Sequence, residues 1–196
     1  MSPRGVATPD VRERLFGAAE RIVERDGPGA LTSRAVTTEA GCAKGLLHAH
    51  FAGFDAFVAE LCLDRFAKTA VKARALSRIA GQGTVERNLN DVALALFDSG
   101  GLALSGLAMT RPAAALSIRE ALEGGAPGFT AIQEAIADYL EAERKLHRVA
   151  RTVDPPTVAL AVVGTTHHLL MTSRPGDTDP RPGMLRLIAA LVPAGE

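Results

Sequence analysis

The sequence has few aromatic residues and no excess of charge of either sign. It contains no Trp and one Tyr, and aromatic residues make up 4% of its 196 residues. A platform of stacked rings for single-stranded nucleic acid is therefore not expected. The 22 Lys and Arg residues are matched by 22 Asp and Glu residues, which excludes binding to nucleic acid through overall charge. Any contact with nucleic acid has to come from a local patch.

The features of exported and membrane-spanning proteins are also missing. Two cysteines, Cys42 and Cys62, are too few for a disulfide framework, and residues 1–10 lack the apolar segment of a signal peptide. The longest segment without a charged side chain is 155–173. Because it begins with two prolines and contains adjacent histidines, we interpret it as a buried helix, and a membrane span is the weaker alternative. We expect a cytoplasmic protein without a membrane partner.

The motifs of the common enzyme classes do not occur. There is no Gly-rich nucleotide loop, no His-Glu-x-x-His, no Gly-x-Ser-x-Gly and no Cys-x-x-Cys. Cys42, His48 and His50 are close in sequence, but residues two positions apart do not share a helix face, so we expect no metal site. We expect no catalytic residue and no cofactor. An all-α enzyme is the rival interpretation, and it requires a named acid or base.

Apolar residues recur at helical spacing, and no alternating runs suggest a sheet. In the first segment the stripe of Val11, Leu15 and Ile22 predicts a helix over about 9–26, with Thr8 as its N-cap and Gly27 as its stop. Gly and Pro residues separate the further predicted helices, at about 32–40, 43–50, 53–81, 84–97, 102–109, 112–122, 130–149, 156–172 and 182–192. We therefore predict an all-α protein.

The segment from Leu31 to Phe51 carries the functional signal. It consists of two short predicted helices joined at Gly41, which is the geometry of a helix-turn-helix whose second helix enters the DNA major groove. We expect Phe51 to pack in the core and to anchor the motif to the first helix. The residues that the second helix offers to base edges are Lys44, Gly45, Leu46 and His48.

The start of the preceding helix is suited to DNA phosphates. Thr32, Ser33 and Arg34 place two hydroxyls and a guanidinium there, beside free backbone N–H groups. For Lys44, contact with DNA is favoured over a role as a solvated surface lysine. For His50, a contact with the DNA backbone and a structural role both stay open.

These spacings resemble the TetR family of bacterial transcriptional regulators over the first quarter to third of the chain. The matching residues are Arg14-Leu15, Ala18-Ala19, Gly27, Leu31-Thr32, Arg34, Ala40-Gly41, Gly45, His50-Phe51 and Asp55. The resemblance implies an N-terminal three-helix DNA-binding domain (residues 1–52). It also implies a larger helical domain (53–196) that binds an effector and forms a homodimer through the last two helices.

The resemblance also implies that some residues of the second domain line an effector cavity, although all of them could simply form its core. The candidates are Phe66, Phe97, Met109, Phe129, Tyr139, His167 and Met171. For His167, a place in the core or in an interface is the default interpretation, and ligand sensing is the minor one.

The chain departs from the family pattern where DNA is normally contacted. Ala43 replaces a capping Ser, Leu46 a Thr, His48 a Tyr and Phe54 a Lys. Residues 1–51 hold seven Lys and Arg against six acids, so we expect either a modest affinity for DNA or a contribution to it from Arg4 in a flexible N-terminal arm.

The sequence leads us to expect a homodimeric repressor that binds a pseudo-palindromic operator, with recognition helices about 34–36 Å apart. A small, largely apolar effector releases it by binding the two head arrangements with different affinity. The alternative is a helix-turn-helix relic that binds a ligand or a protein partner but no longer binds DNA.

Overall fold

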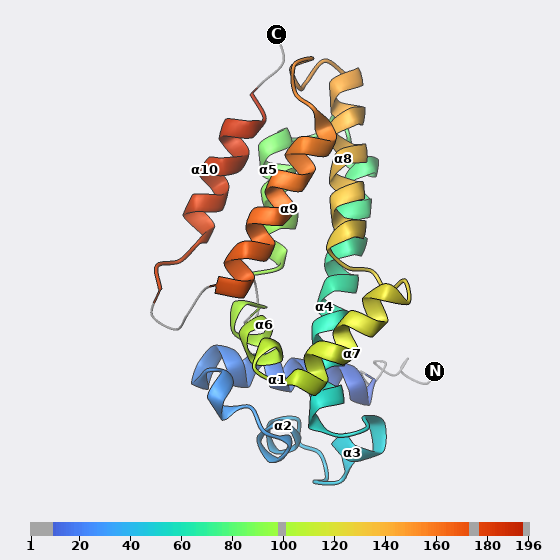
Figure 1. Ribbon diagram of the computed structural model, residues 1–196, viewed down its shortest axis with the longest axis vertical. Coiled ribbons are helices and arrows are strands. Elements are labelled where there is room, and N and C mark those ends of the chain that lie inside the picture. The colour runs from blue at the N-terminus through green and yellow to red at the C-terminus, as the bar shows by residue number, and fades with distance from the viewer. Residues whose placement is uncertain (1–9, 98–100, 173–176, 194–196) are drawn as a thin grey trace, which may run out of the picture.

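The computed structural model describes residues 10–97, 101–172 and 177–193, and for residues 101–103 it describes only the backbone. Within these residues every regular element is a helix, so the all-α class predicted from periodicity is confirmed. The molecule is elongated, with the N-terminal helices at one end and the C-terminal helices at the other (Figure 1).

The N-terminal end, here called the head, is built from α1 (Val11–Asp26), α2 (Ser33–Glu39) and α3 (Leu46–His50). The apolar stripe of α1 faces inward and shares one core with α2, α3 and the first half of α4 (Phe54–Ala75). Three aromatic rings whose centroids lie 5.0, 5.6 and 5.7 Å apart fill the centre of this core: Phe16, Phe51 and Phe57. The expected anchoring of Phe51 on the first helix is confirmed.

The opposite end, here called the body, is a bundle around the second half of α4. Its other helices are α5 (Val85–Ala95), α8 (Phe129–Lys145), α9 (Pro155–Thr172) and α10 (Arg181–Leu191). They share a second core. The inner face of α9 is buried in it, whereas its outer face, including Leu160, is exposed, so the predicted buried helix is buried on one face only. No described helix has both the length and the apolar character that crossing a bilayer requires.

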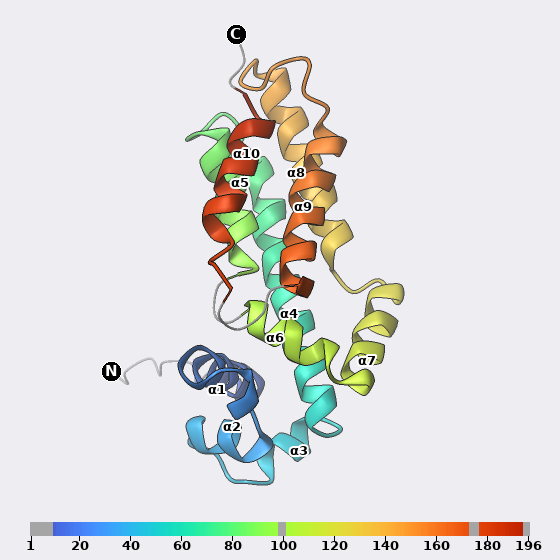
Figure 2. The same ribbon diagram turned by 60° about the vertical axis from the view of Figure 1, so that its left-hand side comes forward.

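Two further helices lie beside α4, between the head and the body (Figure 2). They are α6 (Gly101–Met109) and α7 (Pro112–Glu123). Three of their buried side chains belong to the core of the head, and α4 contributes to both cores. The division of the chain into residues 1–52 and 53–196 stays a prediction.

The beginning of α1 differs from the predicted one. α1 begins at Val11, and Asp10 is its N-cap, because the Asp10 carboxylate accepts a hydrogen bond from the Arg12 N–H (3.4 Å). The predicted cap, Thr8, lies outside the described residues, as does Arg4.

Three other helices fall short of their predicted bounds by three residues or more at one end. α3 begins at Leu46 rather than at residue 43, because no side chain caps it. α4 ends at Ala75 and is followed by a 3₁₀ turn, Leu76–Ile79. α8 ends at Lys145 rather than at residue 149, because His147 adopts a left-handed conformation (φ 59°) that terminates a helix.

Candidate nucleic-acid interface

The turn between α2 and α3 has a fixed geometry. Gly41 is left-handed (φ 63°), and the Cys42 N–H donates to the Thr37 carbonyl (2.9 Å), which closes the end of α2. Arg14 of α1 donates to the Ala40 carbonyl (2.9 Å) at the same end. The angle between α2 and α3 is therefore set by the turn itself and by a contact with α1.

We expect Gly41→Ala to lower the free energy of unfolding by about 1–2 kcal/mol, because a side chain disfavours the left-handed conformation. Urea unfolding followed by circular dichroism measures the change. The matched control is Gly29→Ala, since Gly29 does not have a positive φ and an added Cβ meets no atom within 4 Å. Equal unfolding midpoints for the two variants would contradict the role of the turn.

The C-terminal end of α3 is held by one arginine of α1. Arg12 lies over the ring of Phe51, 4.4 Å from its centroid, and donates to the His50 carbonyl (3.1 Å). The same guanidinium forms an ion pair with Glu60 of α4. Because Arg12 contacts both α3 and α4, it fixes where α3 ends relative to the long helix.

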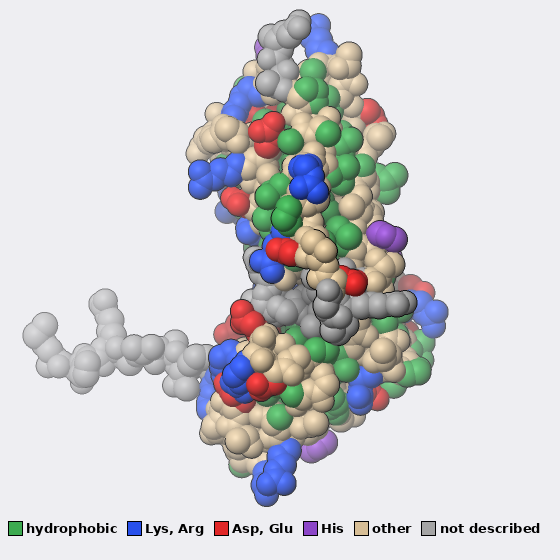
Figure 3. Space-filling view, turned by 90° about the vertical axis from the view of Figure 1, so that its left-hand side faces the viewer, with side chains coloured by type: hydrophobic (Ala, Val, Ile, Leu, Met, Phe, Trp, Pro, Cys, Tyr) green, Lys and Arg blue, Asp and Glu red, His purple; other side chains and the backbone are tan. Residues whose placement is uncertain are grey.

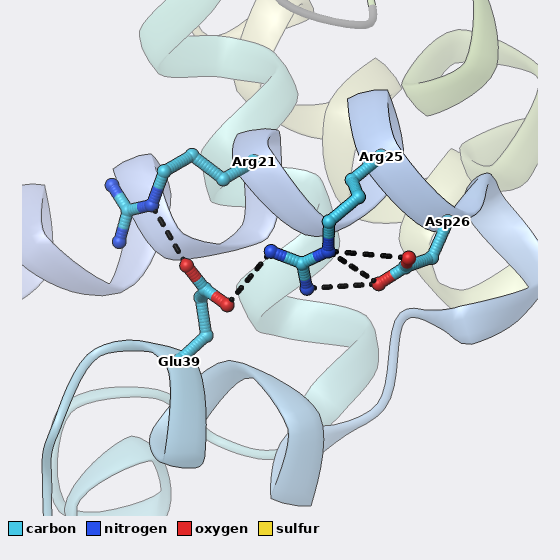
Figure 4. A network of polar contacts seen from close by, with 4 residues as sticks. All are labelled: Arg21, Arg25, Asp26 and Glu39. Carbon is cyan, nitrogen blue, oxygen red and sulfur yellow. Dashed lines mark hydrogen bonds and ion pairs between the residues drawn. The ribbon is translucent and has the colours of Figure 1, made fainter.

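A network of ion pairs joins α2 to the end of α1 (Figure 4). Glu39 accepts hydrogen bonds from Arg21 (2.9 Å) and Arg25 (3.1 Å), and Arg25 also pairs with Asp26 (2.8 Å). The hydrogen bonds from Arg21 and Arg25 lower the pKa of the Glu39 carboxyl. Those to Asp26 and then Glu39 raise the pKa of Arg25. The network occupies two cations that would otherwise be free.

We expect Glu39→Gln to destabilise the protein at pH 7 and to have little effect in acid. A carboxyl with a lowered folded-state pKa stabilises the fold above its ordinary value of 4.5, and this contribution is lost as the pH falls through the lowered value. Urea midpoints of the variant and the wild type should therefore differ at about pH 7 and converge at about pH 3. Glu24→Gln, an exposed acid of α1, is the control. A difference that persists in acid would contradict this origin.

The predicted DNA contacts gather on α2, on α3 and on the turn between them, at the end of the molecule remote from the body (Figure 1). Ser33 and Leu46 are half-buried, and the exposed ones are Thr32, Arg34, Lys44, Gly45, His48 and His50. The Thr32 hydroxyl caps α2 by accepting from the Ala35 N–H (3.1 Å). Lys44 and Gly45 lie in the turn before α3 rather than on it. An open hollow of about 610 Å³ between α1 and α2 includes Thr32 and Arg34 in its lining.

Few of the cations of the head are free to meet DNA. Residues 10–51 contain six Lys and Arg, and the four on α1 are paired with other groups of the protein. The other two are Arg34 and Lys44, whose side chains form no hydrogen bond or ion pair within the described ranges. The positive charge available at this end is therefore local.

The candidate effector residues do not form one cluster. Phe66, Phe97 and Tyr139 are buried in the core of the body, and Phe129 and Met171 are half-buried against it. Contacts between aromatic rings connect three helices of the body: Phe66 to Phe129 (4.8 Å between centroids) and Phe129 to His167 (4.9 Å). The side chains of His167 and Met109 are exposed, and Met109 lies on α6, outside the core of the body.

Tyr139 takes part in a buried polar cluster. Its hydroxyl accepts a hydrogen bond from the Asn88 amide (2.8 Å). Burial is the main reason why the pKa of Tyr139 is raised, with the neighbouring Glu143 adding to the effect. The raised pKa keeps the Tyr139 hydroxyl protonated at neutral pH. Its hydrogen bond with Asn88 joins α8 to α5.

The described residues show neither a metal-binding cluster nor a reactive thiol at Cys62. Within the described residues no three His, Cys, Asp or Glu side chains are placed to hold a metal ion. Burial raises the pKa of the Cys62 thiol to about 12, so this thiol is protonated and unreactive at neutral pH.

Sequence reasoning did not predict the contacts through which arginines position the head. Arg111, just before α7, pairs with Asp55 and lies over the ring of Phe54 (4.9 Å), at the start of α4. The Arg111–Asp55 partners are 56 residues apart in sequence, and the Arg14–Ala40 partners are 26 apart. No local pattern marks such pairs.

No protein-family model and no curated protein matches the sequence, whereas solved structures match nearly all of the chain. A protein from Mesorhizobium loti MAFF303099, described as a TetR-family transcriptional regulator, has a TM-score of 0.63 and 15% identity over 91% of each chain. Reduced NemR from E. coli has the same TM-score and identity over 95% of this chain and 99% of its own. Bacillus subtilis FadR, solved with stearoyl-CoA, has a TM-score of 0.57 and 14% identity over 90% and 96%.

Proposed function

We propose, from the TetR-like fold of this chain, that the protein is a DNA-binding transcriptional regulator that acts as a homodimer. The observation that carries the proposal is the head, where six of the eight predicted DNA contacts are exposed and Arg34 and Lys44 have no partner among the described residues. In this arrangement Lys44 and His48 approach base edges, while Thr32 and Arg34 contact phosphates.

The outer faces of α9 and α10 support dimerisation. Leu160 of α9 and Leu185 of α10 are 58% and 39% exposed, although both are large apolar side chains. α9 and α10 lie side by side (Figures 1 and 2), and Figure 3 shows hydrophobic side chains gathered over the upper part of this side of the molecule. A second copy that covers this surface would place two heads on one operator.

The body supports regulation by a small, largely apolar effector. Its core is largely apolar apart from buried polar residues such as Asn88 and Glu143, and the buried ring of Phe66 contacts the half-buried ring of Phe129. One protein of the same fold was solved with stearoyl-CoA, so this fold can accept a ligand with a long apolar chain. Without the effector, the dimer would bind its operator and repress by occlusion. Effector binding that favours a different separation of the two heads would release the operator.

Binding to DNA tests the proposal directly. The protein is titrated into DNA from upstream of its own reading frame and into sequences selected from a random duplex pool. We expect Arg34→Ala and Lys44→Ala each to weaken binding at least about tenfold, because one contact contributes about 1–3 kcal/mol and a dimer loses two. Arg119→Ala, at an exposed arginine of α7, is the charge control.

Salt dependence tests whether phosphate contacts contribute to binding. Affinity should fall with salt along a slope of several charges, and the Arg34 variant should show a shallower slope. If the wild-type protein binds no sequence above background, the regulator proposal fails and the non-DNA-binding alternative takes its place.

A further inference from the structure

Two segments far apart in sequence meet at the end of the body remote from the head. The first is residues 72–87, from the end of α4 to the start of α5, and the second is residues 141–154, from the end of α8 to the start of α9. Together these two segments are called the distal end. The Gly81 N–H donates to the Glu143 carboxylate (3.1 Å), and Arg148 donates to the Gly83 carbonyl. Glu143 is fully buried, so the junction is a packed part of the fold.

The distal end carries an excess of positive charge. It holds eight Lys and Arg against four Asp and Glu, which is a net charge of +4 in a chain whose 22 cations and 22 acids balance. Three of these acids are already engaged by neighbouring groups: Glu141 by Arg144 and Lys145, Glu143 by Arg148, and Asp154 by Thr157. Within the described ranges, the side chains of Arg78, Arg87 and Arg151 form no ion pair.

Part of this charge surrounds a hollow. The hollow measures about 320 Å³, and four residues, none of them acidic, line it: Arg144, Lys145, His147 and Arg151. His147 has the left-handed conformation (φ 59°) that ends α8, a position at which glycine is favoured. The chain thus places His147 on the wall of a hollow that Arg144, Lys145 and Arg151 also line. Arg144 and Lys145 pair with Glu141, whereas Arg151 forms no ion pair within the described ranges.

We propose that this hollow binds a phosphate group, carried by a small diphosphate or phosphomonoester. Guanidinium groups donate paired hydrogen bonds to phosphate oxygens, and an ammonium and an imidazole N–H add further donors. The lining contains no Phe, Tyr or Trp ring on which a nucleic acid base could stack. The four lining residues come from one short segment, so this open hollow suits a compact anion better than an extended polymer. The site is separate from the DNA interface and does not depend on the proposed function.

Calorimetric titration of the full chain with sodium diphosphate and with inorganic phosphate tests the proposal, with sodium chloride at equal ionic strength as the reference. We expect saturable binding of diphosphate with a Kd below about 1 mM, and none of chloride. Heat that is no larger than that of chloride would overturn the proposal.

Three variants separate binding from folding. Arg151→Gln and His147→Gly should each weaken diphosphate binding at least tenfold, whereas Arg119→Gln on α7 should leave it unchanged. His147→Gly is informative because glycine suits the left-handed position, so its melting temperature should not fall. Diphosphate affinity within twofold of the wild type in both site variants, or an equal loss in Arg119→Gln, would overturn the proposal.

Two further experiments, vesicle sedimentation and displacement by duplex DNA, identify the source of the phosphate. Sedimentation with phosphatidylcholine vesicles that contain phosphatidylinositol bisphosphate, reversed by diphosphate, would support a lipid headgroup; failure to sediment, with diphosphate binding intact, would support a free small molecule. If duplex DNA displaces diphosphate and Arg151→Gln loses both, the distal end is a nucleic-acid surface and the proposal is wrong.

Discussion

Phe57→Ala is expected to lower the free energy of unfolding by about 3–5 kcal/mol, because it leaves a cavity in the head. Phe57 is fully buried, and its ring lies 5.0 Å from that of Phe51, 5.7 Å from Phe16 and 6.0 Å from Phe54. These rings join α1, the end of α3 and the start of α4. Losing the central one removes packing from all three elements, so DNA binding should fall together with stability.

Urea unfolding followed by circular dichroism at 222 nm measures this loss, since the chain has no Trp and one Tyr for fluorescence. Val71→Ala is the matched control on the same helix, because Val71 is 67% exposed and its truncation should change stability by about 0.5 kcal/mol or less. A Phe57→Ala variant that loses less than about 1 kcal/mol would show that the aromatic cluster does not hold the head on α4.

Leu160→Asp is expected to convert the proposed dimer into a monomer. Leu160 faces outward from α9, so the substitution leaves the core of the subunit unchanged. In a twofold interface it would bury two carboxylates without partners, which costs several kcal/mol. A monomer presents a single head, so operator affinity should fall by about 10²–10⁴-fold through loss of the linked second contact.

Light scattering coupled to size exclusion gives the oligomeric state, and fluorescence anisotropy with a labelled operator gives the affinity. Leu116→Asp is the control, because Leu116 is 45% exposed but belongs to α7, which lies away from α9 and α10 (Figure 1). A Leu160→Asp protein that is still a dimer and binds DNA normally would place the interface elsewhere on the molecule.

Local sequence signals were sufficient for most of the fold. Helical periodicity placed the helices, and short-range chemistry identified Thr32 as the cap of α2 and Gly41 as its end. The predicted boundaries were wrong where a terminus depended on an irregular backbone, as at His147 after α8. The residues around His147 carry no sequence signal that this histidine adopts a left-handed conformation.

Local sequence signals were also sufficient to propose the candidate interface. All eight proposed DNA contacts come from residues 32–50, whose relative positions follow from two short helices and one turn. The effector residues were harder to predict. They come from helices distributed through the chain, and only packing decides that Phe66, Phe129 and His167 meet while Met109 is exposed on α6.

The amino-acid order by itself determined the helical class and the position of the helix-turn-helix, because hydrogen bonding within a helix and capping act over a few residues. The tertiary structure alone decided which charges are free. It pairs the arginines of α1 inside the head, whereas Arg34 and Lys44 pair with none of the described residues, and it brings residues 72–87 beside residues 141–154. Electrostatic interaction depends on distance in space, and the distance between remote segments is set only when the core packs.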